Sequence, residues 1–323
     1  MALVIDRLTA GGLTLEAARL GGGPGPRIAV LGGVHGDELE GVLAAQRLIG
    51  ALGTRTLHGT VTVLPLANPP ALTAGTRAGA DDENLARVFP GAADGTLSAR
   101  IAHAISAGLI ADCDLLIDLH SAGRRYRMPP LCGLPAKGTV GGRPLLDVAR
   151  TTAFPFLWAH GSVAPGRSVS HAEALGKPWV YFECGGGGAL REHDIDRYVT
   201  SVLRLLAEVG VLDAEPAPAP AAPQVVVRDG DGNTDDGIVL GASGLFVTRC
   251  AAGDAVTGGQ ILGTVHGPDG AVLETVRAAA GGYVMMLRHD FEVAAGDVAA
   301  IVAGTGGGAG TGGGAGTGGD GAA

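Results

Sequence analysis

Apolar and polar positions divide the chain into two parts with different periodicities. In the first part, short continuous apolar runs bounded by glycine or polar residues predict buried strands. Two such runs are residues 28–33 and 178–182, and residues 114–119 give a third buried-strand pattern that contains Asp114 and Asp118. Longer stretches with helical periodicity lie around them, at residues 38–50, 97–109 and 195–209. Because buried strands alternate with helices, we predict an α/β fold in which helices pack on a sheet.

The second part has a β pattern. Short β-type runs at residues 244–248, 260–265, 283–287 and 298–302 are separated by Gly-Asp and Pro-Asp-Gly turns. Alternating proline and alanine before them predict an extended linker, and the Gly-rich near-repeat that ends the chain cannot bury a core. We therefore predict four segments: an α/β domain over 1–213, a linker over 214–224, a small all-β domain over 225–302 and a disordered tail over 303–323.

Ligand-type side chains follow three of the predicted strands. His35 and Glu38 come directly after one run, His120 after the next, and Glu183 at the end of the third. In open α/β sheets, sites form outside the carboxyl ends of the strands. Catalytic zinc usually takes three protein ligands, and imidazole and carboxylate are typical ones. The sequence therefore predicts zinc on His35, Glu38 and His120, with Glu183 as general base for the water that the metal activates.

Each of these residues alone has an ordinary structural explanation. A lone His-x-x-Glu is usually a solvated pair, and a histidine that ends a strand is more often hydrogen-bonded than metal-bound. Strand ends are generally polar, which would account for Glu183. The combination carries the prediction, because three strand ends each have a ligand-type residue flanked by glycine or serine.

Composition narrows the classes of function. With 323 residues, 46% of them hydrophobic, the chain can form one large and one small domain. A net charge of −9 and only 4% aromatic residues argue against a nucleic-acid partner. No apolar run approaches membrane-spanning length, and the N-terminus lacks the basic start and long apolar core of a signal peptide. We expect a cytoplasmic protein with no membrane partner.

The four cysteines, Cys113, Cys132, Cys184 and Cys250, show neither metal-binding spacing nor a disulfide framework. Cys184 adjoins Glu183, but we predict that it packs as a small apolar residue and is not a nucleophile.

Five sequence blocks resemble the succinylglutamate desuccinylase/aspartoacylase family, relatives of the zinc carboxypeptidases. They occur in family order at residues 33–38, 64–71, 84–91, 118–121 and 183–186. The Asn-Leu-x-Arg-Val-Phe-Pro-Gly block at 84–91 makes the match specific. The resemblance implies a zinc carboxypeptidase-like mixed sheet flanked by helices and one zinc ion per chain on His35, Glu38 and His120. It also implies that Glu183 is the catalytic acid/base.

The resemblance further implies roles for two arginines. Arg77 matches the arginine that polarises the scissile carbonyl, and Arg87 matches one that grips a substrate carboxylate. A guanidinium binds carboxylate in a bidentate way and keeps its charge. The family usually has Asn immediately before the second arginine, where this chain has Ala86. Asn84 is then expected either to replace that substrate contact or to cap a turn.

The β domain resembles biotinyl/lipoyl-type folds at residues 252–263. A carrier domain needs an acceptor lysine, and no lysine follows Lys177 in the sequence. We therefore predict that this domain covers the active-site mouth or forms a subunit contact. The sequence is compatible with a homo-oligomer and does not decide the oligomeric state.

These observations favour a zinc-dependent amidohydrolase that removes an acyl group from a small anionic N-acyl amino acid. Two alternatives stay open: a zinc carboxypeptidase that acts on peptides, and a non-catalytic ligand-binding protein on the same fold. Glu183 favours an enzyme, because a binding protein needs no base there. We expect residues 161–171 and 124–127 to shape the pocket, and the arginines at 124, 125 and 127 favour an anionic substrate. The overall pattern looks closest to the N-acetyl-diaminobutyrate deacetylase branch of the family.

Overall fold

A computed structural model describes residues 3–213 and 223–306, and within them nine strands form one large sheet. Their order is β1-β2-β4-β3-β5-β11-β7-β10-β12. The strands are β1 (Leu3–Ala10), β2 (Leu13–Gly21), β3 (Arg27–Gly32), β4 (Thr60–Leu64), β5 (Leu115–Leu119), β7 (Leu131–Pro135), β10 (Phe156–His160), β11 (Trp179–Glu183) and β12 (Val225–Val227). Strands β4, β3, β5 and β11 are parallel, whereas β1, β2 and β7 pair antiparallel with neighbours. The predicted mixed sheet is confirmed.

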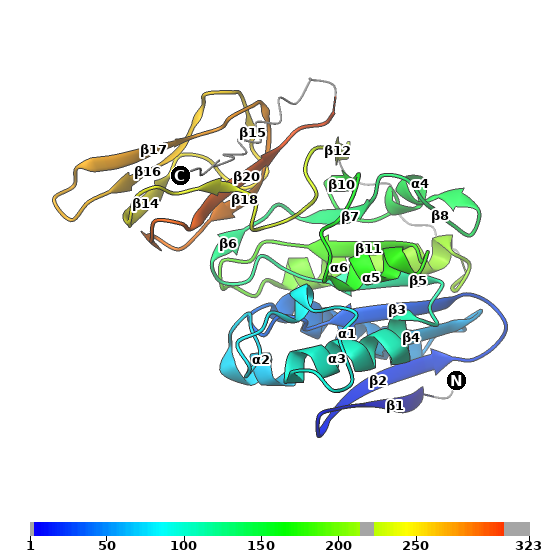
Figure 1. The fold of residues 1–323 in the computed structure, drawn as a ribbon. Coiled ribbons are helices and arrows are strands. Elements are labelled where there is room, and N and C mark those ends of the chain that lie inside the picture. Colours follow the sequence, from blue (N-terminus) through cyan, green and yellow to red (C-terminus); the bar gives the residue numbers. More distant parts are fainter. Residues whose placement is uncertain (1–2, 214–222, 307–323) are drawn as a thin grey trace, which may run out of the picture.

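Helices cover both faces of this sheet (Figure 1). Alternate residues of β3 supply both cores: Ile28 and Val30 pack toward one face, and Ala29 and Leu31 toward the other. The first face is covered by α1 (Leu39–Gly53), α4 (Leu145–Ala149) and α6 (Glu192–Glu208). The second is covered by η1 (Leu85–Arg87), α3 (Leu97–Ile105), the π-helical turn η2 (Ser106–Ile110) and α5 (Ser168–Ala174), while α2 (Pro69–Ala74) follows β4. Burial on both faces explains the continuous apolar runs in the sequence.

The strand order places the predicted site residues at one edge of the sheet. Strand β5 lies between β3 and β11 and is parallel to both. The carboxyl ends of these strands therefore meet, and the segments that carry His35, His120 and Glu183 start there.

The C-terminal part folds as two antiparallel sheets, as the sequence predicted. One has the order β13-β20-β18-β15 and the other β17-β16-β14-β19. The strands are β13 (Ile238–Val239), β14 (Gly244–Thr248), β15 (Ala255–Val256), β16 (Ile261–His266), β17 (Val272–Arg277), β18 (Gly282–Arg288), β19 (Glu292–Val293) and β20 (Val298–Ala303). Their shared core includes Phe246, Leu262 and Val284.

The two parts are joined through strands and through apolar packing. Strand β6 (Tyr126–Arg127) of the first part pairs with β18 of the C-terminal part. Strands β8 (Thr139–Val140) and β9 (Arg143–Pro144) pair only with each other, in a separate hairpin. Met286 and Val298 of the β sheets pack in one cluster with Leu131 and Trp158 of the large sheet. In Figure 1 the β sheets accordingly lie beside β6 and β7.

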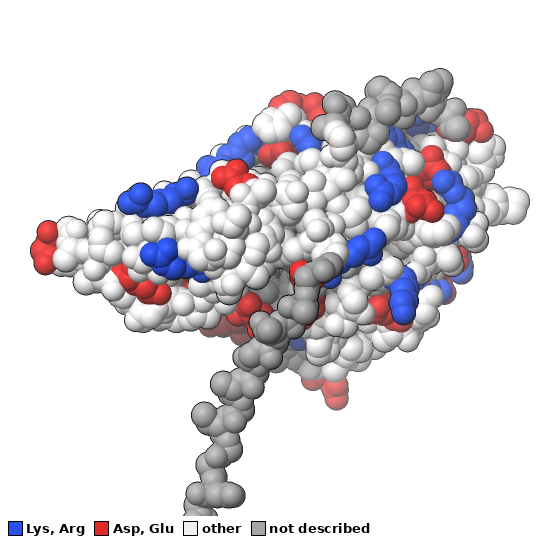
Figure 2. All heavy atoms as spheres, turned by 90° about the horizontal axis from the view of Figure 1, so that it is seen from above, with Lys and Arg blue, Asp and Glu red and all other residues white. Residues whose placement is uncertain are grey.

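The chain also returns to the large sheet after the predicted linker, because β12 pairs in parallel with β10. Most of that linker, residues 214–222, and the tail from residue 307 lie outside the described residues, so the predicted segmentation stays a prediction. No helix in the described ranges is long and apolar enough to cross a membrane. On the face in Figure 2, basic and acidic side chains are scattered over a largely uncharged surface.

Candidate metal and catalytic site

A tight turn after β3 sets the positions of His35 and Glu38. Gly33 has φ +65°, and a Cβ at Gly36 would lie 2.0 Å from the carbonyl carbon of Ala71, so this motif requires glycine. Asn68 caps α2 by accepting from Ala71 N at 3.2 Å and donates to Val34 O at 3.3 Å. The turn is therefore anchored on the helix that follows β4.

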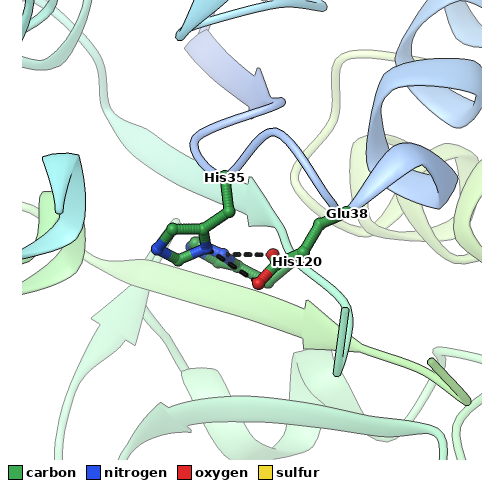
Figure 3. Close-up of side chains that lie close together, drawn as sticks. All are labelled: His35, Glu38 and His120. Atoms are coloured by element: carbon green, nitrogen blue, oxygen red, sulfur yellow. Dashed lines mark hydrogen bonds and ion pairs between the residues drawn. The ribbon is translucent and has the colours of Figure 1, made fainter. Parts of the chain in front are cut away.

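His35, Glu38 and His120 converge on one point (Figure 3). Their ligand atoms all lie within 4.8 Å of one another. Nδ1 of His35 is 2.8 Å from Oε1 of Glu38, and Nδ1 of His120 is 3.0 Å from Oε2. The His35 and Glu38 side chains are 1% and 2% exposed, so these two groups are shielded from solvent.

The orientation of the two histidine rings fits a metal. Nε2 of His35 faces Oδ1 of Asn84 at 3.0 Å, and Nε2 of His120 faces Oδ2 of Asp118 at 3.1 Å. With an acceptor beside each Nε2, Nδ1 is the ring nitrogen that is turned toward Glu38. Two Nδ1 atoms that face one buried carboxylate suit a shared cation, which would take the place of a proton between them.

The pKa shifts of His120 and Glu38 also fit a cation at this site. Burial opposes the charged form of His120, but the carboxylates of Asp118 and Glu38 outweigh it and raise the pKa of His120 well above its usual range. Burial also opposes ionisation of Glu38, yet the two histidines hold the pKa of Glu38 well below its usual range. The cluster thus favours a positive charge between its carboxylates.

Glu38 also accepts hydrogen bonds from two groups that are not candidate metal ligands. Nη1 of Arg77 donates to Oε1 at 2.7 Å, and the backbone N–H of Ser121 donates to Oε2 at 3.0 Å. The Arg77 side chain is 42% exposed and borders both cavities described below, so it can turn from Glu38 toward a bound molecule.

Glu183 stands at the same edge, at the end of β11. Its side chain is half-buried, and Oε2 is enclosed without a hydrogen-bond partner. Burial, together with the negative charge of Glu38, raises the pKa of Glu183 to about 8. A carboxyl group with a pKa near neutrality and a free oxygen at a cavity wall can take up and return a proton.

Two cavities meet at Arg77, Glu183 and Thr234. The smaller, of about 70 Å³, contacts His35 and His120. The larger, of about 560 Å³, is lined by residues that include Arg124 and Arg125 and also Met286 and Val298 of the β sheets. The C-terminal part thus forms one wall of the space that leads to Glu183.

The smaller cavity contains the predicted Arg87 and the neighbouring Ala86. A Cβ at Gly166 would lie 2.3 Å from the carbonyl oxygen of Arg87, so the loop before α5 packs directly on that backbone. Asn84 lies behind His35, and its Oδ1 also accepts from Ala86 N at 2.9 Å. This geometry supports a role in orienting His35, and its predicted contact with substrate stays a prediction.

Comparison with known proteins identifies the family of this chain. A sequence profile of the succinylglutamate desuccinylase/aspartoacylase catalytic domain matches residues 24–209. The N-alpha-acetyl-L-2,4-diaminobutyric acid deacetylase of Halomonas elongata is 30% identical over 286 residues, which cover 87% of this chain and 83% of that protein. This chain belongs to the succinylglutamate desuccinylase/aspartoacylase family. The family predicted from the sequence blocks is confirmed.

Solved structures of the family share the fold. A succinylglutamate desuccinylase/aspartoacylase from Rhodobacter sphaeroides superposes with a TM-score of 0.79 at 26% identity, over 90% of this chain and 89% of that chain. The ectoine utilization protein EutE from Ruegeria pomeroyi, solved with product bound, gives 0.80 at 26% identity, over the same shares of the two chains.

The smaller cavity is also lined by Arg167, which belongs to the segment 161–171 that we expect to shape the pocket. Burial lowers the pKa of Arg167, and the nearby Arg87 lowers it further, so two guanidinium groups face the same space. Tyr181 and Asp231 line the cavity as well, although the sequence did not single them out as site residues. Tyr181 belongs to the same apolar run as Glu183, but Asp231 stands in a loop without any recognisable motif, so only the fold brings Asp231 to the site.

Proposed function

We propose that this chain is a zinc-dependent deacylase that hydrolyses the amide bond of a small N-acyl amino acid with a free carboxylate. One observation carries the proposal: a buried His-Glu-His donor set lies at the same sheet edge as a glutamate with an unpartnered oxygen. Membership of a family whose named members are deacylases and desuccinylases supports it. His35, Glu38 and His120 would hold one zinc ion per chain.

Zinc, when bound, supplies a Lewis acid that polarises a carbonyl and makes water more acidic. Glu183 then serves as the acid/base: its free carboxylate oxygen takes the proton of the attacking water and returns it to the leaving amine nitrogen. Burial raises the pKa of Glu183 above its usual range, which suits a group that must return the proton as well as accept it.

The arginines position the substrate in this proposal. Arg77, which borders both cavities next to Glu38, stabilises the negative charge that develops on the carbonyl oxygen. Arg87, in the smaller cavity, pairs with the carboxylate of the amino-acid moiety. A cavity of about 70 Å³ favours a small amino acid over a peptide on this side. The β sheets, with Met286 and Val298 in the wall, act as a cap.

The relative from Halomonas elongata suggests the first substrate to test, N-acetyl-2,4-diaminobutyrate. Turnover should be measured for N-acetyl, N-succinyl and N-formyl amino acids and for dipeptides with the zinc-loaded protein. We expect hydrolysis of an N-acyl amino acid and much slower cleavage of dipeptides. Masking the free carboxylate as an amide should slow hydrolysis, because the neutral amide offers Arg87 no negative charge to pair with. Dipeptides as the best substrates, or no hydrolysis of any compound, would refute the proposal.

A further inference from the structure

The loop between β12 and β13, residues 230–236, reaches the site although it follows the predicted linker. Thr234 borders both cavities, Asp231 borders the smaller and Asp235 the larger. Nη2 of Arg167 donates to Oδ1 of Asn233 at 2.7 Å, which fixes the loop against the cavity. This segment therefore supplies acidic side chains beside the arginines that would bind a substrate carboxylate.

The carboxylate of Asp235 forms an ion pair with the guanidinium group of Arg87. Both Nε and Nη2 of Arg87 donate to Oδ2 of Asp235, at 3.2 and 2.8 Å. The Asp235 side chain is 65% exposed, whereas that of Arg87 is 28% exposed. An ion pair so open to solvent contributes little to stability, so a second carboxylate can displace Asp235 at small cost.

When a substrate carboxylate displaces Asp235 from Arg87, the negative charge of Asp235 is left without a partner. If the incoming molecule carries only carboxylates, the released Asp235 repels it. If the molecule carries an ammonium group next to its carboxylate, Asp235 gains a new cation as it loses Arg87. One internal ion pair is then exchanged for two pairs with the bound molecule, and the local charge stays balanced.

We propose, building on the deacylase function above, that Asp235 determines specificity by selecting N-acyl amino acids whose side chain carries an ammonium group. In the free protein Asp235 shields Arg87. In the complex the substrate carboxylate pairs with Arg87, and the side-chain ammonium pairs with Asp235. Substrates with an acidic side chain are disfavoured because their second carboxylate meets the released Asp235.

Asp235→Asn tests this role, because it removes the charge and keeps the shape. N-acetyl-2,4-diaminobutyrate and N-acetylnorvaline have side chains of equal length that end in ammonium and in methyl. The wild-type protein should prefer the first substrate by about two- to fivefold in kcat/KM, the scale of a solvent-exposed ion pair. Asp235→Asn should lose most of that preference through slower reaction of the ammonium substrate, while the rate with N-acetylnorvaline is kept or rises.

Asp236→Asn is the matched control. It removes the same charge one residue later, and in the described part of the chain Asp236 contacts Asn233 and lines neither cavity. This variant should keep the wild-type preference. An unchanged preference in Asp235→Asn would overturn the specificity role.

Product binding separates this inference from the deacylase proposal. Calorimetry gives the Kd of 2,4-diaminobutyrate and of norvaline for the zinc-loaded protein, and needs no turnover. We expect the ratio of the two Kd values to fall toward one in Asp235→Asn. A ratio equal to that of the wild type would refute the role of Asp235 even for an active enzyme, whereas absent hydrolysis with a changed ratio would refute only the deacylase function.

Discussion

Oδ2 of Asp118 lies 3.1 Å from Nε2 of His120, two residues further along the chain. Residues two apart on a strand point to the same side, and Asp118 is the penultimate residue of β5. Asp118 is fully buried and also accepts a hydrogen bond from Ser168 of α5. A carboxylate fixed in this way holds the His120 ring with its Nδ1 directed at Glu38.

Asp118→Asn should therefore weaken zinc binding, since it removes the negative charge behind His120. We expect the Kd for zinc to rise by about 10–100-fold, measured by competition with a chelator. Asp114→Asn is a suitable control, because Asp114 precedes the same strand and pairs with the exposed Arg27 at 3.6 Å. Ser168→Ala should have a smaller effect in the same direction. Equal zinc affinities of Asp118→Asn and the wild-type protein would contradict this role.

The metal assignment predicts about one zinc per chain by elemental analysis, as a single site with two histidines and a glutamate requires. His35→Ala and His120→Ala should each lose most of the metal, because two remaining ligands hold it weakly. His103→Ala, an exposed position on α3, should keep it. Full zinc occupancy in both ligand variants would show that the metal binds elsewhere or not at all.

Much of this site could be predicted from the sequence, because its groups stand at strand ends. A buried strand leaves a continuous apolar run, and the first polar residue after it must lie at the sheet edge. His35 and Glu183 follow this rule, and His120 stands directly after a strand whose apolar run is interrupted only by Asp118. Their strands turned out to be neighbours, but no local pattern encodes which strands pair.

The rest of the site depends on contacts between distant segments. Asp235 stands in a loop whose sequence would suit any solvated turn, and only the return of the chain through β12 places it there. The sequence predicts that Asn84 either contacts substrate or caps a turn, and the structure shows the cap, because its Oδ1 accepts from Ala86 N. The sequence did not indicate that the same oxygen also lies against His35.

Glu183→Gln keeps the size of the side chain and removes its ability to accept a proton. Turnover should fall by roughly a hundredfold or more if Glu183 is the acid/base. Zinc content should stay at the wild-type level, because Glu183 does not belong to the His35–Glu38–His120 donor set. Rates should be expressed per bound zinc, which separates lost chemistry from lost metal. Near-normal turnover of this variant would assign the base to another group.

His160 makes stability depend on pH. Its ring is buried next to Trp158, with Nε2 2.7 Å from the hydroxyl of Tyr181 and Nδ1 3.3 Å from the carbonyl oxygen of Gly230. Burial lowers the pKa of His160 to about 4, so the folded protein holds it neutral.

In the unfolded chain a histidine ionises near pH 6.5. As pH falls from about 6.5 to 4, the unfolded state therefore binds a proton that the folded state does not, and stability declines. The full loss from this group is roughly 3 kcal/mol of the free energy of unfolding. Urea unfolding of the wild type and of His160→Asn at pH 7 and pH 4.5 isolates this contribution. The variant should be less stable than the wild type at pH 7, because the Tyr181 hydroxyl loses its acceptor, but it should lose less stability on acidification. An equal loss in both proteins would show that His160 is protonated in the folded state or that other groups carry the pH dependence.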